Sequence, residues 1–421
     1  MKTVVLVDLD GTLTATADVS FKEMKDGLVE VDLQKIPLLD GAIDFINQLK
    51  KSCDVFVVSD SHPKYVQKIV NEYFNVPCLS LADKPNTPKT QDFLTGLGYS
   101  ESTLTNFFVV GDTWLDITLG RGLHALTVLV KLYTPENIEE RDGIGQDRKH
   151  WKSGPTFYAK TYNEIISIIG DKTKYLFSGE AVFQDTKSHA AIRFHTEKNS
   201  DRFIAYRALA RQQQGECDSF AVADKYFEFG RSDRSNSTLE KLVTAVEEYI
   251  NFVTSFEYKW DYFICVPDKA TTQPPNKMKG FFDRINVKIA KANLLEWSPL
   301  VSGSTRQKPN FEERVGFVGD NLMLVRNVDF QGKSIIILDD QLTTGATADA
   351  ICQKFIEKGA KNLIFLALFN LVHKVDSQRL CPKCGKKLQI KIKRDDGHRF
   401  FSCVPPQYKG TGCGFLENIP E

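Results

Sequence analysis

The chain has 421 residues, 42% of them hydrophobic and 26% charged, a composition typical of a globular protein of about three domains. Its formal net charge of +0 excludes a global attraction to nucleic acid or to a membrane, so any such attraction has to be local. No apolar stretch is long enough to cross a membrane, and the N-terminus leads directly into a predicted strand. We therefore expect no membrane partner, no signal peptide and a cytoplasmic location.

Residues 1–170 alternate short β-branched runs with amphipathic segments. Examples are TVVLVDLD (3–10), AIDFINQLKK (42–51) and NFFVVGDTWLD (106–116). This alternation predicts βαβ units on a parallel sheet. YNEIISIIG (162–170) is predicted to be the last helix of this first domain.

Two carboxylates follow the first predicted strand. Asp8 and Asp10 are two residues apart, and Gly11 predicts an immediate turn. Carboxylates in this position can act as a nucleophile and as a general acid/base, and they can share a divalent cation. The alternative for this segment alone is a turn or a helix cap without chemistry.

Later residues favour the catalytic interpretation. Ser59 ends a second apolar run, where its hydroxyl can hold a phosphate, and Lys84 supplies a positive charge. Lys89 is the alternative to Lys84 for this role. Asp112 and Asp116 offer the hard oxygen ligands that Mg²⁺ prefers.

The order of these motifs resembles the haloacid dehalogenase-like (HAD) phosphatases over residues 1–170. The resemblance implies that Asp8 forms an aspartyl-phosphate and that Asp10 protonates the leaving group and then activates water. The ligands it implies are Ser59 and Lys84 for the phosphoryl oxygens, and Asp8, Asp10 through its main-chain carbonyl, Asp112 and Asp116 for Mg²⁺.

The spacing of the motifs also bears on the substrate. Only 48 residues separate Asp10 from Ser59, and only 24 separate Ser59 from Lys84, which leaves no room for a large cap domain. Cap domains exclude water and select small substrates. We therefore expect an open site that suits a bulky or macromolecular phosphoester, with a neighbouring domain as an alternative lid.

Residues 174–376 form the second predicted α/β domain, and IIILDDQLTTGAT (335–347) is its most informative segment. A buried strand is expected to end at Leu338, just before Asp339 and Asp340. Backbone N–H groups at the start of the following helix, together with threonine hydroxyls, predict an anion site. The two carboxylates can accept hydrogen bonds from sugar hydroxyls, so the segment predicts a site for a ribose 5-phosphate.

This segment resembles the phosphoribosyl pyrophosphate (PRPP) motif of type I phosphoribosyltransferases. Its surroundings resemble the competence-associated ComF type, with Val266 and Pro267 at a strand end, a basic KGF segment (279–281) and a TRQKP loop (305–309). The resemblance implies a Mg²⁺-dependent transferase. The PRPP-binding residues it implies are Asp339, Asp340, Thr343, Thr344, Gly345, Ala346, Thr347, Lys269 and Arg306.

Two departures from that pattern affect this assignment. Gln341 follows the acid pair where many members carry an apolar residue, and Asp268 with Lys269 makes an unusual pyrophosphate loop. Ligand binding without turnover, and a strand–turn–helix without a ligand, remain alternatives. FIAYRALARQQQ (203–214) is compatible with a helix and carries no functional prediction.

The last predicted domain, residues 377–421, contains Cys-x2-Cys followed by Cys-x9-Cys. Four thiolates suit a structural, tetrahedral Zn²⁺ site; free thiols are the alternative. The segment resembles the zinc ribbons of type IA topoisomerases, and LQIKIKR (388–394) is predicted to be a strand. The four predicted zinc ligands are Cys381, Cys384, Cys403 and Cys413.

The same domain has nine Lys/Arg and four Asp/Glu, a net charge of +5, which a four-thiolate zinc site reduces to +3. Basic side chains with Phe400, Phe401 and Tyr408 can hold single-stranded nucleic acid through phosphate contacts and base stacking. His398 is either exposed or a further ligand. The equally weighted alternative is a ribbon that only packs on another domain or on a partner.

The sequence therefore predicts two doubly wound, parallel-sheet, Rossmann-like α/β domains and a small four-cysteine zinc ribbon. The leading hypothesis is a bifunctional enzyme that uses Mg²⁺ in both catalytic domains and acts on PRPP and on small phosphorylated or ribosylated substrates in nucleotide or nucleobase metabolism. The alternative is a nucleic-acid-binding repair or defence factor. Its phosphatase would process strand ends, and its transferase-like domain would sense a ribosyl phosphate.

Overall fold

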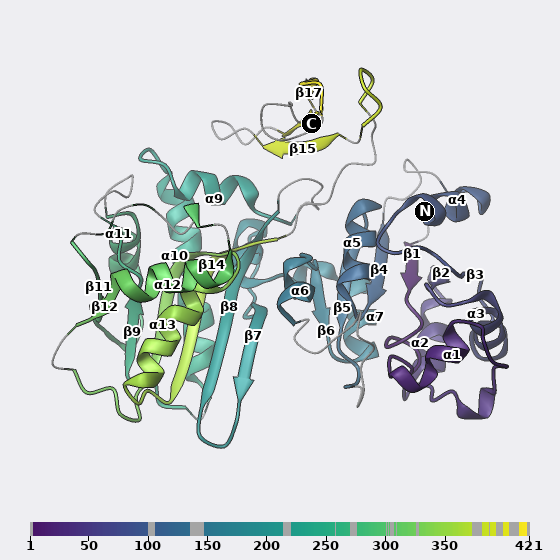
Figure 1. Ribbon diagram of the computed structural model, residues 1–421, viewed down its shortest axis with the longest axis horizontal. Coiled ribbons are helices and arrows are strands. Elements are labelled where there is room, and N and C mark those ends of the chain that lie inside the picture. Colours follow the sequence, from purple (N-terminus) through teal and green to yellow (C-terminus); the bar gives the residue numbers. More distant parts are fainter. Residues whose placement is uncertain are drawn as a thin grey trace. The chain divides into compact units, whose positions relative to one another are not determined.

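The structure is a computed structural model (Figure 1). It describes residues 3–99, 106–134, 147–213, 220–256, 258–269, 276–299, 301, 303, 307–308, 310–325, 328–372, 381–386, 388–392, 399–403 and 412–418. The chain divides into two compact units, one with the N-terminal residues through Tyr175 and one with Leu176–Gln212 and Phe220–Val372.

The N-terminal unit is built on a six-stranded sheet in the order β3-β2-β1-β4-β5-β6, in which every neighbouring pair is parallel. Its β-branched strands are buried on both faces, as parallel strands between helices are. The strands are β1 (Thr3–Val7), β2 (Cys53–Val58), β3 (Cys78–Leu79), β4 (Phe107–Gly111), β5 (Leu126–Val130) and β6 (Phe157–Ala159).

Amphipathic helices connect these strands. The last, α7, begins after Thr161, whose hydroxyl accepts a hydrogen bond from the Glu164 backbone at 3.2 Å, and it runs from Tyr162 to Gly170 as the sequence predicts. The other helices are α1 (Lys22–Lys25), α2 (Ala42–Leu49), α3 (Pro63–Ile69), α4 (Pro88–Gly96), α5 (Trp114–Gly122) and α6 (Asp147–Lys152), with the 3-10 helices η1 (Val19–Phe21), η2 (Leu33–Lys35) and η6 (Lys172–Tyr175) and the π-helix η3 (Val70–Phe74).

The second unit has its own six-stranded sheet, in the order β10-β9-β13-β14-β8-β7. All neighbouring pairs are parallel except the last, because β7 and β8 form an antiparallel hairpin at one edge (Figure 1). The predicted α/β class is thereby confirmed. The strands are β7 (Ile192–Lys198), β8 (Phe203–Gln212), β9 (Tyr262–Cys265), β10 (Ala290–Lys291), β13 (Ser334–Leu342) and β14 (Asn362–Leu371), and a separate antiparallel pair joins β11 (Leu295–Trp297) to β12 (Leu322–Leu324).

Long apolar side chains fill the space between this sheet and its helices. Phe263, Phe281 and Ile336, from a strand, a helix and a second strand, are all fully buried in one cluster. The helices are α8 (Ser178–Ala181), α9 (Ala223–Phe229), α10 (Asn236–Thr254), α11 (Lys277–Arg284), α12 (Phe311–Asn321) and α13 (Ala346–Glu357), with the short turn η7 (Val182–Gln184).

Two sequence predictions are wrong here. The segment 203–214, whose sequence is compatible with a helix, contains the strand β8, which pairs with β14 along its whole length. The strand that was expected to end at Leu338 continues through Asp339 and Asp340 to Leu342, because β14 pairs with it as far as Asn370. The acid pair therefore lies inside a strand and not in the turn after it.

The tail contains a small antiparallel sheet of β15 (Gln389–Ile392), β16 (Arg399–Ser402) and β17 (Leu416–Asn418). The strand predicted from LQIKIKR is confirmed as β15. Within the described parts of the whole chain, no helix combines the length and the apolar character that crossing a membrane requires.

Candidate functional sites

The carboxyl edge of the N-terminal sheet brings together the residues that the sequence selected there. Asp8 follows β1, Ser59 follows β2 and Asp112 follows β4, and these three strands are neighbours. Parallel strands end at the same edge of a sheet, and that edge is where open α/β sheets hold their ligands. The site therefore follows from strand order, although its residues are up to about a hundred positions apart in sequence.

A lysine lies between two of the carboxylates. The Lys84 ammonium donates to Asp8 Oδ1 at 2.5 Å and to Asp116 Oδ1 at 2.6 Å, and its side chain is only 5% exposed. Thr113 holds the other oxygen of Asp116 with its backbone N–H at 3.1 Å and its hydroxyl at 2.7 Å. Lys89 is exposed and its ammonium donates to the Leu81 carbonyl, so of the two lysines only Lys84 lies within this carboxylate cluster.

Burial and neighbouring charges set the protonation of this cluster. Burial raises the pKa of Asp8 well above its usual range, and the Asp116 carboxylate raises it further, while Lys84 lowers it. Burial lowers the pKa of Lys84, but Asp116 and Asp8 more than reverse this, so the net direction is upward and the ammonium stays charged. One cation for two buried carboxylates leaves a local excess of negative charge.

That excess, together with the oxygen donors, fits a divalent cation. Asp8, Asp112 and Asp116 place ligand oxygens within 4.8 Å of one another. All are hard oxygen donors, the kind that Mg²⁺ selects. Gly11 keeps this edge open, because it has φ +94° and a Cβ there would lie 2.1 Å from Asp112 Oδ2.

Asp10 occupies a different environment from Asp8. Its Oδ1 accepts hydrogen bonds from Thr16 at 2.7 Å and from the Tyr65 hydroxyl at 2.9 Å. Its Oδ2 accepts from Ser61 at 2.9 Å and from Ser59 at 3.3 Å. Hydroxyls hold this carboxylate and an ammonium holds the other, so the two acids are separated by chemical environment. Ser61 and Tyr65 were not among the residues selected from the sequence.

The second unit contains a related cluster. Asp339 is buried and accepts a hydrogen bond from the backbone N–H of Asp340 at 2.9 Å. Burial, with the Asp340 charge second, raises the pKa of Asp339 well above its usual range. The Lys277 ammonium forms an ion pair with Asp340, and the pair is mostly shielded from solvent, with side chains 13% and 25% exposed. Lys277 is a residue that the sequence analysis missed.

The loop after the acid pair leads directly into the start of α13. Gly345 has φ +88° at the N-cap of α13, and the Ala346 backbone donates to the Thr344 hydroxyl at 3.4 Å. The first N–H groups of a helix lack intrahelical partners and can bind an anion. Thr343 and Thr347 flank the same turn and are half-buried.

The side chains of the predicted pyrophosphate loop contact other parts of the second unit. Lys269 lies between two aromatic rings, with its ammonium 4.5 Å from the centroids of both Trp297 and Phe317, and it donates to the Gly303 carbonyl at 3.3 Å. Asp268 accepts from the Met278 backbone at the start of α11 at 2.8 Å. Arg306 lies outside the described residues.

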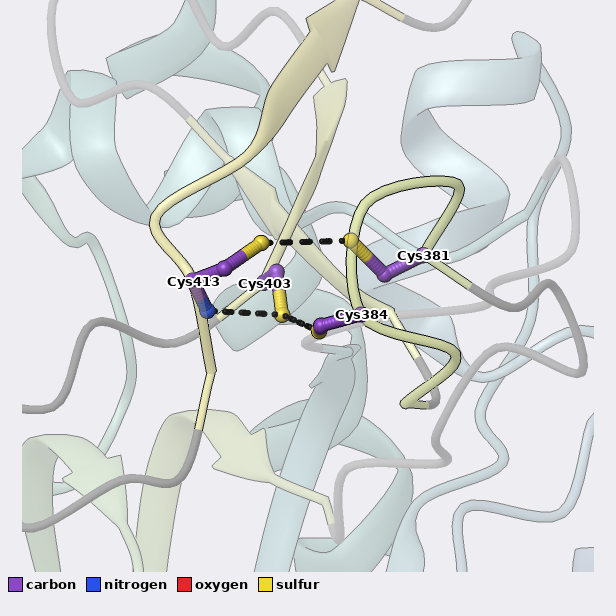
Figure 2. A group of neighbouring side chains, drawn as sticks. All are labelled: Cys381, Cys384, Cys403 and Cys413. Atoms are coloured by element: carbon purple, nitrogen blue, oxygen red, sulfur yellow. Dashed lines mark hydrogen bonds between the residues drawn. The ribbon is translucent and has the colours of Figure 1, made fainter.

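The four cysteines of the tail converge, as Figure 2 shows. Their sulfur atoms lie within 4.8 Å of one another, with 3.4 Å between Cys381 and Cys413 and 3.4 Å between Cys384 and Cys403. Zn–S bonds of about 2.3 Å in a tetrahedron separate the sulfurs by about 3.8 Å, so the set fits zinc. A hydrogen bond from the Lys386 backbone helps to lower the pKa of Cys384 to about 7, which favours the thiolate.

Of the aromatic residues proposed for stacking, Phe400 and Phe401 lie on β16 and are half-buried. Phe401 packs against the small core around Cys381, Leu388 and Cys403. Tyr408 and His398 lie outside the described residues.

No family model and no curated protein matches this chain. Among solved structures, it is similar to a predicted phosphoglycolate phosphatase from Haemophilus somnus, with 16% identity, 40% of this chain and 97% of that chain covered, and a TM-score of 0.29. It is also similar to a HAD family hydrolase from Deinococcus radiodurans with bound phosphate and sodium. The identity is 12%, the match covers 40% of this chain and 96% of that chain, and the TM-score is 0.31. A third similar structure is an L-2-haloacid dehalogenase from Xanthobacter autotrophicus, with 11% identity, 41% of this chain and 99% of that chain covered, and a TM-score of 0.29. These scores are low, so the geometry of the site carries the proposal below.

Proposed function

We propose that the N-terminal unit is a Mg²⁺-dependent phosphoester hydrolase of the HAD type, with Asp8 as nucleophile. The observation that carries this proposal is the cluster of Asp8, Lys84, Asp112 and Asp116 at the carboxyl edge of a parallel sheet. Three carboxylates around one buried ammonium can hold a cation and a phosphate together. A purely structural ion pair would need only one acid.

The residues divide the reaction between them. An Asp8 oxygen attacks phosphorus and forms an aspartyl-phosphate, while the bond from phosphorus to the leaving oxygen breaks and Asp10 gives that oxygen a proton. Asp10 then takes a proton from a water molecule, which attacks the same phosphorus and releases phosphate and free Asp8. Ser59 and Lys84 hold the phosphoryl oxygens. Asp8, the Asp10 carbonyl, Asp112 and Asp116 would hold Mg²⁺, which offsets the negative charge of the phosphoryl group.

Replacement of the nucleophile tests this proposal. We expect Asp8→Asn to abolish Mg²⁺-dependent hydrolysis of p-nitrophenyl phosphate, because an amide is a far poorer nucleophile than a carboxylate. Asp92→Asn, on the exposed side of α4, is the matched control and should retain wild-type rates. Full activity in Asp8→Asn would contradict the assignment of Asp8 as the nucleophile.

We propose further that the second unit is a PRPP-binding phosphoribosyltransferase of nucleotide or nucleobase metabolism. Its support is the acid pair Asp339–Asp340 near the end of β13, followed a few residues later by Gly345 at the N-cap of α13. The carboxylates would accept hydrogen bonds from the ribose hydroxyls, and the loop 343–347 would bind the 5-phosphate. Lys269, Arg306 and Mg²⁺ are proposed for the pyrophosphate side.

Transfer at this site breaks the bond between ribose C1′ and the pyrophosphate oxygen, and pyrophosphate leaves with the electron pair. An acceptor nitrogen forms the new bond to C1′ and loses its proton to solvent. Asp339→Asn should abolish pyrophosphate release from PRPP and Mg²⁺ with a mixture of free bases. Tight PRPP binding without release by the wild-type protein would indicate a sensor and not an enzyme.

We propose a structural Zn²⁺ held by the four tail cysteines. Four thiolates leave no open position for chemistry. Metal analysis of the purified full chain should give about one zinc per molecule, and Cys381→Ser should lower this value while p-nitrophenyl phosphate hydrolysis persists. An unchanged zinc content in that variant would contradict the ligand set.

A further inference from the structure

Helix α9 brings side chains to the carboxyl end of β13, next to the acid pair. The Tyr226 hydroxyl donates to Gln341 Oε1 at 3.2 Å. The Tyr226 ring meets the Phe369 ring edge-on, with centroids 5.5 Å apart and planes at 78°. This corner of the sheet therefore combines a carboxamide with two aromatic rings, beside the place where a ribosyl group is proposed to bind.

Strand register places Gln341 on the side of Asp339. Side chains alternate along a strand, so residues two apart share a face. Gln341 pairs with Phe369 on β14, and Phe369 pairs with Ala210 on β8. Gln341 is half-buried, so it is held by its neighbours and still reachable.

The hydrogen bonds of Gln341 fix its orientation and leave capacity for a ligand. A primary carboxamide offers two N–H donors and two acceptor lone pairs. Within the described residues, one lone pair of Gln341 faces the Tyr226 hydroxyl and one N–H bonds the carboxamide oxygen of Gln212, which is 1% exposed. One donor and one acceptor remain, and the same count holds if the amides of Gln341 and Gln212 are turned over together, with the Tyr226 hydroxyl then accepting.

We propose that Gln341, held by Tyr226 and Gln212, selects the acceptor of the transferase, and that this acceptor is a neutral nitrogen heterocycle with adjacent donor and acceptor atoms. A lactam or an amino-imine edge satisfies both remaining positions at once. The half-buried ring of Tyr226 provides apolar surface for a planar molecule, and the fully buried Phe369 supports that ring from the core. This inference rests on the transferase function proposed for the same unit.

Matched pairs of bases test it on the full chain with saturating PRPP and Mg²⁺, by calorimetric titration. Hypoxanthine and adenine are compared with unsubstituted purine, and uracil with pyrimidine. A site built to hydrogen-bond its ligand discriminates strongly against an analogue that lacks the groups. The wild-type protein should bind one substituted base at least about tenfold more tightly than its bare ring.

The Gln341→Leu variant should reduce that preference to about twofold or less. Tyr226→Phe, which removes only the anchoring hydroxyl, should give an intermediate preference. Gln353→Leu, on the exposed side of α13, is the matched control and should keep the wild-type preference.

A titration with PRPP alone separates the two levels of the proposal. If the wild-type protein binds no PRPP, both the proposed transferase function and this inference are rejected. If PRPP binds but no base is preferred over its bare ring, or if Gln341→Leu keeps the preference, only the inference is overturned. Calorimetry on the same samples reads both quantities.

Discussion

The two units contain the same motif in two versions, a pair of carboxylates with one lysine at the carboxyl edge of a sheet. In the N-terminal unit Lys84 bridges Asp8, which follows β1, and Asp116, in the first turn of α5, and its side chain is 5% exposed. In the second unit the Lys277 side chain is 13% exposed, and among the described residues it pairs with Asp340. Burial raises the pKa of an aspartate in both, Asp8 and Asp339. The lysine of the first version therefore contacts two buried carboxylates, whereas that of the second contacts one that is partly exposed.

The largest difference is expected when the two lysines of the N-terminal unit are compared. Lys84→Met leaves two buried carboxylates without their cation. Breaking a buried pair from one side costs about 3–5 kcal/mol. We expect hydrogen exchange in β1 to rise steeply and hydrolysis of p-nitrophenyl phosphate to be lost. Lys89→Met, which removes one exposed contact to a carbonyl, should change neither; equal effects of the two variants would contradict the assignment of Lys84.

Several of these features could be read from the sequence, because strand ends and small-residue turns are local signals. Asp8, Asp112 and the cysteine pairs stand at positions that local pattern alone predicts. Lys277 could not be found this way, since it lies in a polar segment and meets Asp340 only through tertiary folding. The signal available was its place at the start of an amphipathic helix, next to the predicted pyrophosphate loop.

The strand errors have a physical cause as well. β8 is buried on both faces and rich in Ala and Arg, so it lacks the alternation of a half-exposed strand and resembles a helix. β13 continues through two aspartates, which are poor strand formers, because its neighbour β14 extends equally far. Tertiary pairing overrode local preference at both places.

Two glycines with similar backbone conformations can distinguish an effect on the proposed Mg²⁺ site from the effect of backbone strain alone. Gly11 and Gly98 have φ of +94° and +89°, but a Cβ at Gly11 meets Asp112, whereas nothing lies within 4 Å of one at Gly98. Both alanine variants should incur the strain of about 1–2 kcal/mol that this backbone region costs. Only Gly11→Ala should lose stabilisation by Mg²⁺ in thermal unfolding. If Mg²⁺ stabilised both variants equally in thermal unfolding, Asp112 would not be a ligand of the cation.

A smaller effect is expected in the second unit. Lys277→Met leaves Asp340 with 25% of its side chain exposed, so water replaces part of the lost partner. We expect a loss of about 1–3 kcal/mol, visible as faster hydrogen exchange in β13. Lys279→Met is the control, since its pair with Asp283 is 60% and 57% exposed. A loss as large as that of Lys84→Met would remove the distinction between the two versions.

The smallest effect concerns a carboxylate whose shift has the opposite sign. Burial alone would raise the pKa of Glu228, but hydrogen bonds from Ser235 and Thr238 and the ion pair with Lys225 lower it to about 2. The Ser235 hydroxyl donates to Glu228 Oε1 at 2.5 Å. A depressed pKa means that Glu228 stabilises the fold above its unfolded value of 4.5 and that this contribution is lost as the pH falls toward 2.

Glu228→Gln should therefore lower the free energy of unfolding at pH 7, and the difference from the wild type should shrink between pH 4.5 and pH 3, as measured by urea unfolding. Glu240→Gln, an exposed change on α10, should leave the profile unchanged. A difference that grows as the pH falls would mean that protonation of Glu228 stabilises the folded state. Its hydroxyl and ammonium donors would then not govern its charge, and the contrast with Asp8 and Asp339, whose pKa values burial raises, would not hold.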